Sequence, residues 1–150
     1  MTERSFVDSN ILVYRRDSSA GDKQTRADAW LRRLWETGMG RISVQVLEEF
    51  YAVVTRKLSP GLEPDEARAE ARDFFVWQPE PITSELLDAA WRIEQRYRLS
   101  FWDSLIVAAA QATGCVYLLS EDLQDGQVFG DLTVVDPFTH GPDPVAGAAG

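Results

Sequence analysis

The chain has one cysteine, one histidine and two lysines among its 150 residues, and each scarcity excludes a class of chemistry. The lone Cys115 cannot form an internal disulfide, and one cysteine with one histidine cannot make a typical structural zinc site. Because His140 is the only imidazole and lies near the C-terminal end, a Ser-His-Asp or Cys-His system has no suitable base. With only Lys23 and Lys57, the chain also lacks a late lysine to steady the acyl phosphate of a phosphoaspartyl enzyme.

Long apolar runs are missing as well. The longest, such as residues 105–110, are too short to cross a bilayer, and no apolar signal core precedes the first expected strand. A hydrophobic fraction of 45% with 11% aromatic residues is too high for a disordered chain. We therefore expect a soluble, cytoplasmic protein without a membrane partner, with one domain over residues 1–138 and a flexible tail over residues 139–150 that is rich in Gly, Ala and Pro.

Basic residues are also few: 15 of them stand against 24 acidic residues, which gives a net charge of −9. This balance argues against broad nucleic-acid binding through the electrostatic field alone. Of the 15 basic residues 13 are arginines, which suit bidentate phosphate contacts, and two local pairs stand at Arg15-Arg16 and Arg32-Arg33. Ordinary solvated helix faces carry such pairs too, so the sequence does not assign them to an RNA path.

The hydrophobic pattern alternates short β-rich runs with amphipathic stretches. It predicts strands at residues 5–8, 41–44, 81–83, 115–119 and 132–135. It predicts helices from about residue 10 and at residues 25–37, 45–58, 64–77, 84–98 and 101–113. This β–α–β order indicates an α/β fold, a three-layer α/β/α sandwich with a central, mainly parallel sheet.

Four acidic residues lie at boundaries of these elements: Asp8, Glu49, Asp103 and Asp122. The aspartates at 8 and 122 follow strand ends, and the other two acids are expected in first turns of helices. Because the carboxyl ends of parallel strands share one edge of a sheet, we expect the four carboxylates to converge there. Converging carboxylates repel one another unless a cation lies between them, and Mg²⁺ or Mn²⁺ prefers such oxygen ligands.

Each acid also has a simpler structural interpretation. Asp8 and Asp122 could be helix or turn caps. Asp103 in a first helical turn suits the helix dipole, and Ser100 and Asp103 have the spacing of a capping box. Glu49 lies at the rim of an apolar helix face, where a salt bridge to arginine would also satisfy it, whereas Glu48 points nearly opposite, toward solvent. Only the conjunction of the four positions favours a metal site.

The runs FVDSNILVY, SVQVLEEFY, FWDSLIVAAA and LLSEDLQDGQVFGDLTVVDPF resemble PIN-domain ribonucleases, in particular the toxins of bacterial VapBC toxin–antitoxin pairs, over residues 5–138. The resemblance implies an endoribonuclease dependent on Mg²⁺ or Mn²⁺, whose catalytic and metal-binding acids are carried over as Asp8, Glu49, Asp103 and Asp122. It also implies an RNA substrate, a homodimer and a small antitoxin that blocks the site.

The resemblance also bears on the choice of the last acid, and other residues have alternative roles. The serine or threonine expected two positions before the last acid matches Ser120, which favours Asp122 over Glu121. Asn10 would either orient an acid or cap the first helix. Large apolar residues of the early helices, Trp30, Leu34 and Trp35, would either pack in the core or form a dimer or antitoxin surface. An RNA-processing PIN nuclease that is not a toxin and a non-catalytic RNA- or partner-binding module remain the alternatives.

Overall fold

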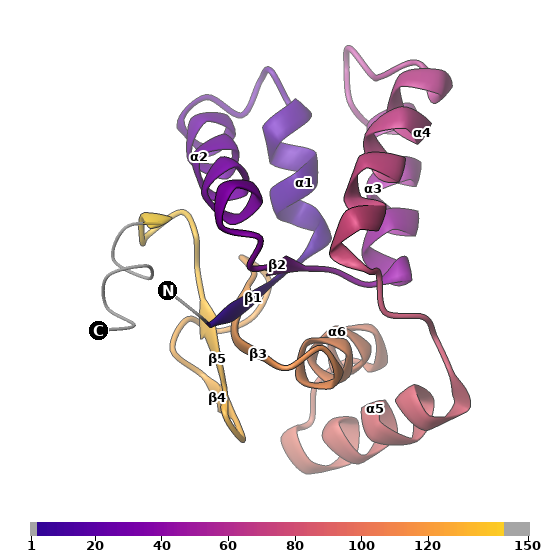
Figure 1. Cartoon of the computed structure of the whole chain (residues 1–150), viewed down its shortest axis with the longest axis vertical. Helices are drawn as coiled ribbons and strands as arrows, with labels where there is room; N and C mark the ends of the chain where they lie inside the picture. The colour runs from indigo at the N-terminus through magenta and orange to yellow at the C-terminus, as the bar shows by residue number, and fades with distance from the viewer. Residues whose placement is uncertain (1–2, 143–150) are drawn as a thin grey trace.

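A computed structural model describes residues 3–142 of the chain and shows a five-stranded sheet (Figure 1). The strands are β1 (Arg4–Val7), β2 (Gly40–Arg41), β3 (Cys115–Leu119), β4 (Val128–Phe129) and β5 (Leu132–Val135). Their order is β2-β1-β3-β5-β4, and every neighbouring pair is parallel except β4 with β5. The mainly parallel sheet predicted from the sequence is therefore confirmed.

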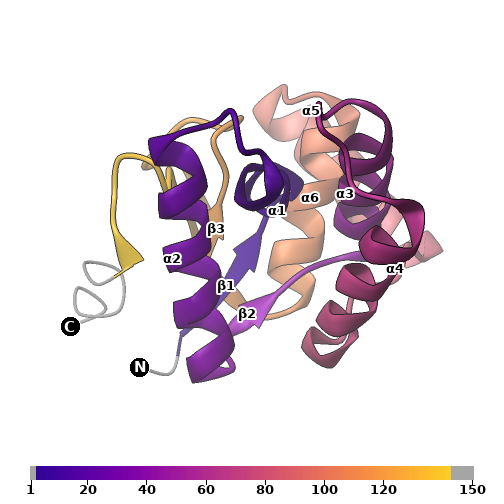
Figure 2. The same cartoon turned by 90° about the horizontal axis from the view of Figure 1, so that it is seen from above.

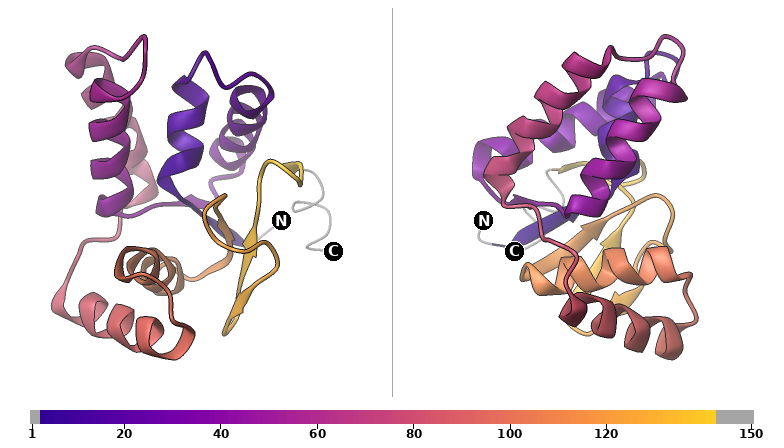
Figure 3. Two further views of the ribbon diagram at one scale, coloured as in Figure 1. Left: turned by 180° about the vertical axis from the view of Figure 1, so that it is seen from behind. Right: turned by 90° about the vertical axis from the view of Figure 1, so that its right-hand side faces the viewer.

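The helices form the outer layers. They are α1 (Ser9–Arg16), α2 (Asp22–Thr37), α3 (Val44–Arg56), α4 (Pro64–Asp73), the 3-10 helix η1 (Phe74–Trp77), α5 (Ser84–Tyr97) and α6 (Phe101–Ala112). Figure 3 shows α5 and α6 on one side of the strands and α1 to α4 on the other, with α3 and α4 beside α1. This is the predicted three-layer α/β/α arrangement. Among the described residues, no helix is both long enough and apolar enough to cross a membrane.

The expected strand at residues 81–83 is wrong. The chain pairs there at one position only, where Glu80 bridges Ser43 in parallel orientation. Prolines flank Glu80 on both sides and supply no backbone N–H, so the pairing cannot extend into a ladder. Thr83 instead becomes the N-cap of α5, and its hydroxyl accepts a hydrogen bond from the Leu86 amide at 3.1 Å.

Other elements also differ from the prediction. The helix expected to run to residue 77 ends at Asp73 and continues as the 3-10 turn η1. The short strand β4 was not predicted, because two residues are too few to show a periodic pattern. It pairs with β5 across a tight turn in which Gly130 has φ 63°, a backbone conformation that favours glycine.

The core explains the placement of the early aromatic residues. Trp30 is only 1% exposed, and its indole Nε1 donates to the carbonyl oxygens of Pro137 and His140, both at 3.0 Å. Leu34 is buried as well, so the expected dimer or antitoxin surface cannot include these two residues. Trp35 is 47% exposed and remains available.

The C-terminal segment is described only as far as residue 142. Thr139 and His140 donate their amides to the Asp136 carbonyl, and the His140 ring lies 2.9 Å from the Asp125 carboxylate. Residues 143–150, which make up most of the predicted flexible tail, lie outside the described residues. The domain boundary at residue 138 therefore stays a prediction.

Candidate active site

The carboxyl ends of β1 and β3 lie side by side and carry the first acid. Asp8 directly follows β1, and its amide donates to the Leu119 carbonyl at 3.0 Å, so the two strand ends remain paired. Its side chain is 4% exposed. One carboxylate oxygen accepts from the Ser9 amide at 2.7 Å, which caps α1, and the other accepts from the Ser120 hydroxyl at 2.7 Å. The predicted cap is thus present, but it occupies only one of the two oxygens.

The burial of Asp8 changes its ionisation. Loss of solvation on burial raises the pKa of this carboxyl from 3.8 to about 7. The hydrogen bonds from Ser120 and Ser9 act in the opposite direction, while the negative charges of Asp122 and Glu49 raise the pKa further. The four acids predicted from the sequence therefore include three whose charges interact at one place.

Glu49 reaches the same edge from α3. This helix begins at Val44 after the Ser43 cap, so Glu49 lies in its second turn and not in the first turn that we expected. The Ser9 hydroxyl donates to one carboxylate oxygen at 2.8 Å, and the Gln45 amide donates to the other at 2.9 Å. Among residues 3–142, no lysine or arginine forms an ion pair with Glu49, which disfavours the salt-bridge alternative. Glu48 is exposed, as its helical position predicted.

Asp122 and its neighbour Glu121, which follow β3, have different hydrogen-bond partners. The Asp122 amide donates to the Ser120 hydroxyl at 3.1 Å, and the Asn10 side-chain amide donates to the Asp122 carboxylate at 3.1 Å. Glu121 instead accepts from the Tyr14 hydroxyl at 2.6 Å and forms an ion pair with the Lys23 ammonium. The geometry therefore agrees with the preference for Asp122 over Glu121. Asn10 contacts an acid and does not cap the helix.

Asp103 stands in the first turn of α6. Its amide donates to the hydroxyl of the Ser100 cap at 3.1 Å, as the sequence spacing predicted. Burial raises the pKa of the Asp103 carboxyl, the Ser100 hydroxyl lowers it, and the negative charges of Asp122 and Glu49 raise it again. Asp103 and Asp8 thus interact with the same two carboxylates. Figure 2 shows the β1 arrow pointing to the start of α1, with α3 and α6 next to it.

Comparison with known proteins identifies this architecture. The model of the PIN domain family matches residues 5–124, which contain all four acids. The chain belongs to the PIN-domain family. The resemblance predicted from the sequence motifs is thereby confirmed.

Similar folds are also found among solved structures. The crystal structure of Mycobacterium tuberculosis VapC20, a Sarcin-Ricin loop cleaving toxin, matches with a TM-score of 0.59 and 22% sequence identity. The match covers 79% of this chain and 91% of that chain. At this identity the likeness shows a common fold. Comparison with curated proteins gives no match.

The oxygen donors of this PIN domain suit a hard divalent cation. As the side chains stand, the described residues contain no group of three or more Asp, Glu, His or Cys that could hold a metal ion. The chemistry of the donors nevertheless fits, since the interacting groups are carboxylates. Two buried amide oxygens of the described part, Asn10 Oδ1 and Gln45 Oε1, also have no hydrogen-bond partner. Both side chains touch site acids, so their oxygens are available to a cation or its bound water.

Sequence reasoning missed two residues of this site, Ser9 and Gln45. Ser9 gives no signal in the sequence, because its contact with Glu49 spans 40 positions. Gln45 stands four residues before Glu49 in a helix, a spacing that places two side chains next to each other. That spacing would have found Gln45 once the helix was assigned.

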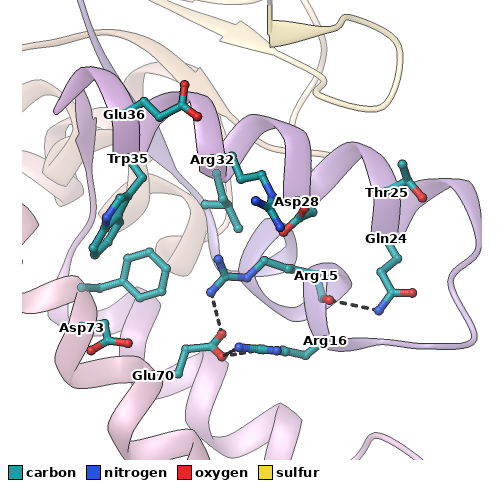
Figure 4. A pocket seen from close by; sticks show the side chains of 12 residues that line it. Arg15, Arg16, Gln24, Thr25, Asp28, Arg32, Trp35, Glu36, Glu70 and Asp73 are labelled. Carbon is teal, nitrogen blue, oxygen red and sulfur yellow. Dashed lines mark hydrogen bonds and ion pairs between the residues drawn. The ribbon is translucent and has the colours of Figure 1, made fainter.

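A cavity of about 860 Å³ lies away from the acidic edge, between α1, α2 and α4 (Figure 4). In its wall the buried Glu70 binds Arg15 at 2.9 Å and also Arg16. Arg32, which also lines the cavity, pairs with Asp28 at 2.6 Å. Arg15 and Arg16 therefore form ion pairs that join α1 to α4. They do not face the four acids of the candidate site.

Proposed function

We propose that this PIN-domain protein is an endoribonuclease dependent on Mg²⁺ or Mn²⁺ and the toxin of a type II toxin–antitoxin pair. One observation carries the proposal: four carboxyl groups from β1, α3, α6 and the β3 end interact electrostatically, and within residues 3–142 none of the four pairs with a lysine or arginine. Repulsion among them destabilises the site unless a cation binds. The RNA substrate is supported by the structural similarity to VapC20, a Sarcin-Ricin loop cleaving toxin.

The residues have distinct proposed roles. Asp8 and Asp103 are the direct metal ligands, and Glu49 and Asp122 act directly or through water. A bound divalent ion supplies an activated water and neutralises charge on the phosphate. The Ser120 hydroxyl holds Asp8 in place while it also receives the Asp122 amide, so one hydroxyl fixes two acids relative to each other.

Ser9, Asn10 and Gln45 complete the support of the site. Ser9 binds Asp8 through its amide and Glu49 through its hydroxyl, at the point where β1 turns into α1. Gln45 steadies Glu49, and Asn10 steadies Asp122. Neutral hydrogen-bond donors orient these carboxylates without cancelling their charge, which leaves the charge available for a cation.

The proposed partners follow from the family resemblance. An antitoxin would cover the acidic edge, and the protein would form a homodimer in the cytoplasm. Of the early aromatic residues expected at a partner surface, Trp35 is still accessible. It lines the cavity together with Phe74, with ring centroids 5.7 Å apart.

Metal-dependent cleavage of single-stranded RNA tests the enzymatic part of the proposal. Purified protein is expected to cleave a mixed-sequence RNA with Mg²⁺ or Mn²⁺, to lose activity in EDTA and to regain it when the metal is returned in excess. This dependence is expected because no lysine or arginine of the described residues pairs with the four acids, so a cation must supply the positive charge. RNA binding without cleavage under every divalent cation would instead favour the non-catalytic binding module.

Growth tests the toxin part. Induction of the wild-type chain in bacteria without a partner is expected to arrest growth, whereas Asp8→Asn at matched protein level is expected to be tolerated, because the variant lacks one metal ligand. Colony counts and immunoblots of both strains are the measurement. If both strains grow equally while the purified wild-type protein cleaves RNA, the protein is an RNA-processing PIN nuclease and not a toxin.

A further inference from the structure

Trp102 is an exposed aromatic ring beside the acidic edge. It directly precedes Asp103 in α6, so their Cα atoms are about 3.8 Å apart. The side chain is 64% exposed, in contrast to the buried Trp30 and Trp77. Leaving most of an indole in contact with water forgoes the stabilisation that burial of its large apolar surface would give. Burial in the hydrophobic core therefore does not account for a tryptophan at this position.

The backbone that carries the ring is tied to the acidic site. The Trp102 carbonyl accepts a hydrogen bond from the Gln45 amide at 3.4 Å, and the same amide group donates to Glu49 at 2.9 Å. The preceding Phe101 ring packs against the indole, with centroids 5.0 Å apart and planes at 71°. Trp102 is thus held on a helix start that the site itself anchors, and it is not on a loose loop.

The charge of the chain limits the ways in which RNA can bind near this ring. With a net charge of −9 the protein offers little long-range attraction to phosphates, and the unpaired acids repel them until a cation is bound. A nucleobase carries no net charge and has two apolar faces. Stacking on an aromatic side chain therefore adds affinity that does not depend on the electrostatic field.

We propose that Trp102 is a stacking platform for an unpaired nucleobase adjacent to the phosphate that is cleaved. The inference rests on the proposed endoribonuclease activity and names the form of its substrate, single-stranded RNA, because bases in a duplex are already stacked and paired. A second copy of the chain is the less suitable occupant. In a two-fold dimer the same patch meets itself, and a contact through Trp102 would bring two acidic edges together.

Binding of a short RNA that contains 2-aminopurine, whose fluorescence is quenched when the base stacks, tests the platform directly. Ca²⁺ replaces Mg²⁺ in this measurement, because it accepts the same oxygen ligands. The wild-type protein is expected to quench the probe, and Trp102→Leu is expected to remove the quenching and weaken binding roughly 5- to 150-fold, the range for loss of one base–aromatic stack. Trp102→Phe keeps an aromatic face and should restore most of the signal.

Steady-state cleavage in Mg²⁺ supplies the second readout. The Trp102→Leu variant is expected to lose kcat/KM mainly through a higher KM, with an unchanged melting temperature. Trp91→Leu is the matched control, since Trp91 is 51% exposed in the outer helix α5 and is not placed at the acids. It should leave KM and quenching unchanged.

The outcomes separate this inference from the proposed function. Equal KM and equal quenching for Trp102→Leu and wild type, with cleavage intact, would overturn the platform and leave the nuclease standing. Loss of quenching in Trp102→Leu, with wild-type protein that never cleaves, would support base stacking on a protein that is only a binding module. A wild-type dimer that dissociates in Trp102→Leu, without any quenching by wild type, would assign the ring to a protein interface and overturn the proposal.

Discussion

Replacing Asp8 with asparagine is expected to lower metal-dependent RNA cleavage more than about 100-fold, since substitution even of groups that only support metal ligands costs roughly 10- to 100-fold. Asp8 is the most buried of the four acids and receives hydrogen bonds from Ser9 and Ser120. Asparagine keeps the size of the side chain but removes the negative charge that a cation needs. Single-turnover cleavage of a labelled RNA with saturating Mn²⁺ measures the loss, and Asp103→Asn is expected to behave in the same way.

Adjacent glutamates in α3 provide the matched control. Glu49→Gln should impair cleavage strongly, because this carboxylate faces the other acids and binds Ser9 and Gln45. Glu48→Gln should be nearly silent, because Glu48 is exposed on the other side of the same helix. Both variants replace one carboxylate with a neutral amide of the same size. Full activity of Glu49→Gln together with an inactive Glu48→Gln would contradict the assignment of the site.

Without metal, the stability of the wild-type protein relative to Asp8→Asn is expected to fall as the pH rises from about 4 to about 7. Burial raises the pKa of Asp8 from 3.8 to about 7, so in this window the folded state keeps a proton that the unfolded state has released. Folding therefore takes up a proton, and a rise in pH opposes it. A shift of about three pH units corresponds to at most roughly 4 kcal/mol of unfolding free energy.

Urea denaturation in EDTA at several pH values measures this difference. Asp8→Asn should be the more stable protein at pH 8, and the advantage should disappear near pH 4, where the carboxyl is protonated in both states. A divalent ion that binds only the folded wild-type protein should restore about 2.7 kcal/mol at 100 times its dissociation constant, and less in the variant. Parallel stability curves for the two proteins, with no response to Mn²⁺, would mean that Asp8 is not a strained metal ligand.

Local features of the sequence predicted much of this structure correctly. The hydrogen bond between the Ser100 cap of α6 and the Asp103 amide could be predicted, because a capping contact spans only three residues. The different directions of Glu48 and Glu49 on α3 could also be predicted, because the helical period alone decides which way each side chain points. The parallel sheet was also predictable, since strands joined by helices must cross over to pair side by side.

Other elements depended on contacts that the local pattern does not contain. Residues 81–83 satisfied a strand pattern, yet prolines limit the pairing there to a single bridge. Trp30 and Trp102 both stand in helices, but one is in the core and the other faces solvent. Only the packing of α2 and α6 against the rest of the fold distinguishes them.

By itself, the sequence determined the candidate residues: four acids that follow strands or stand in helices, in a chain with a single histidine and a single cysteine. The tertiary structure decided how they are held. Ser9 reaches Glu49 across 40 positions, and Lys23 draws Glu121 away from Asp122 across 98 positions. Contacts of this kind arise only when strands and helices distant in the chain pack together, so the physical support of each acid follows from the fold and not from its own neighbours in sequence.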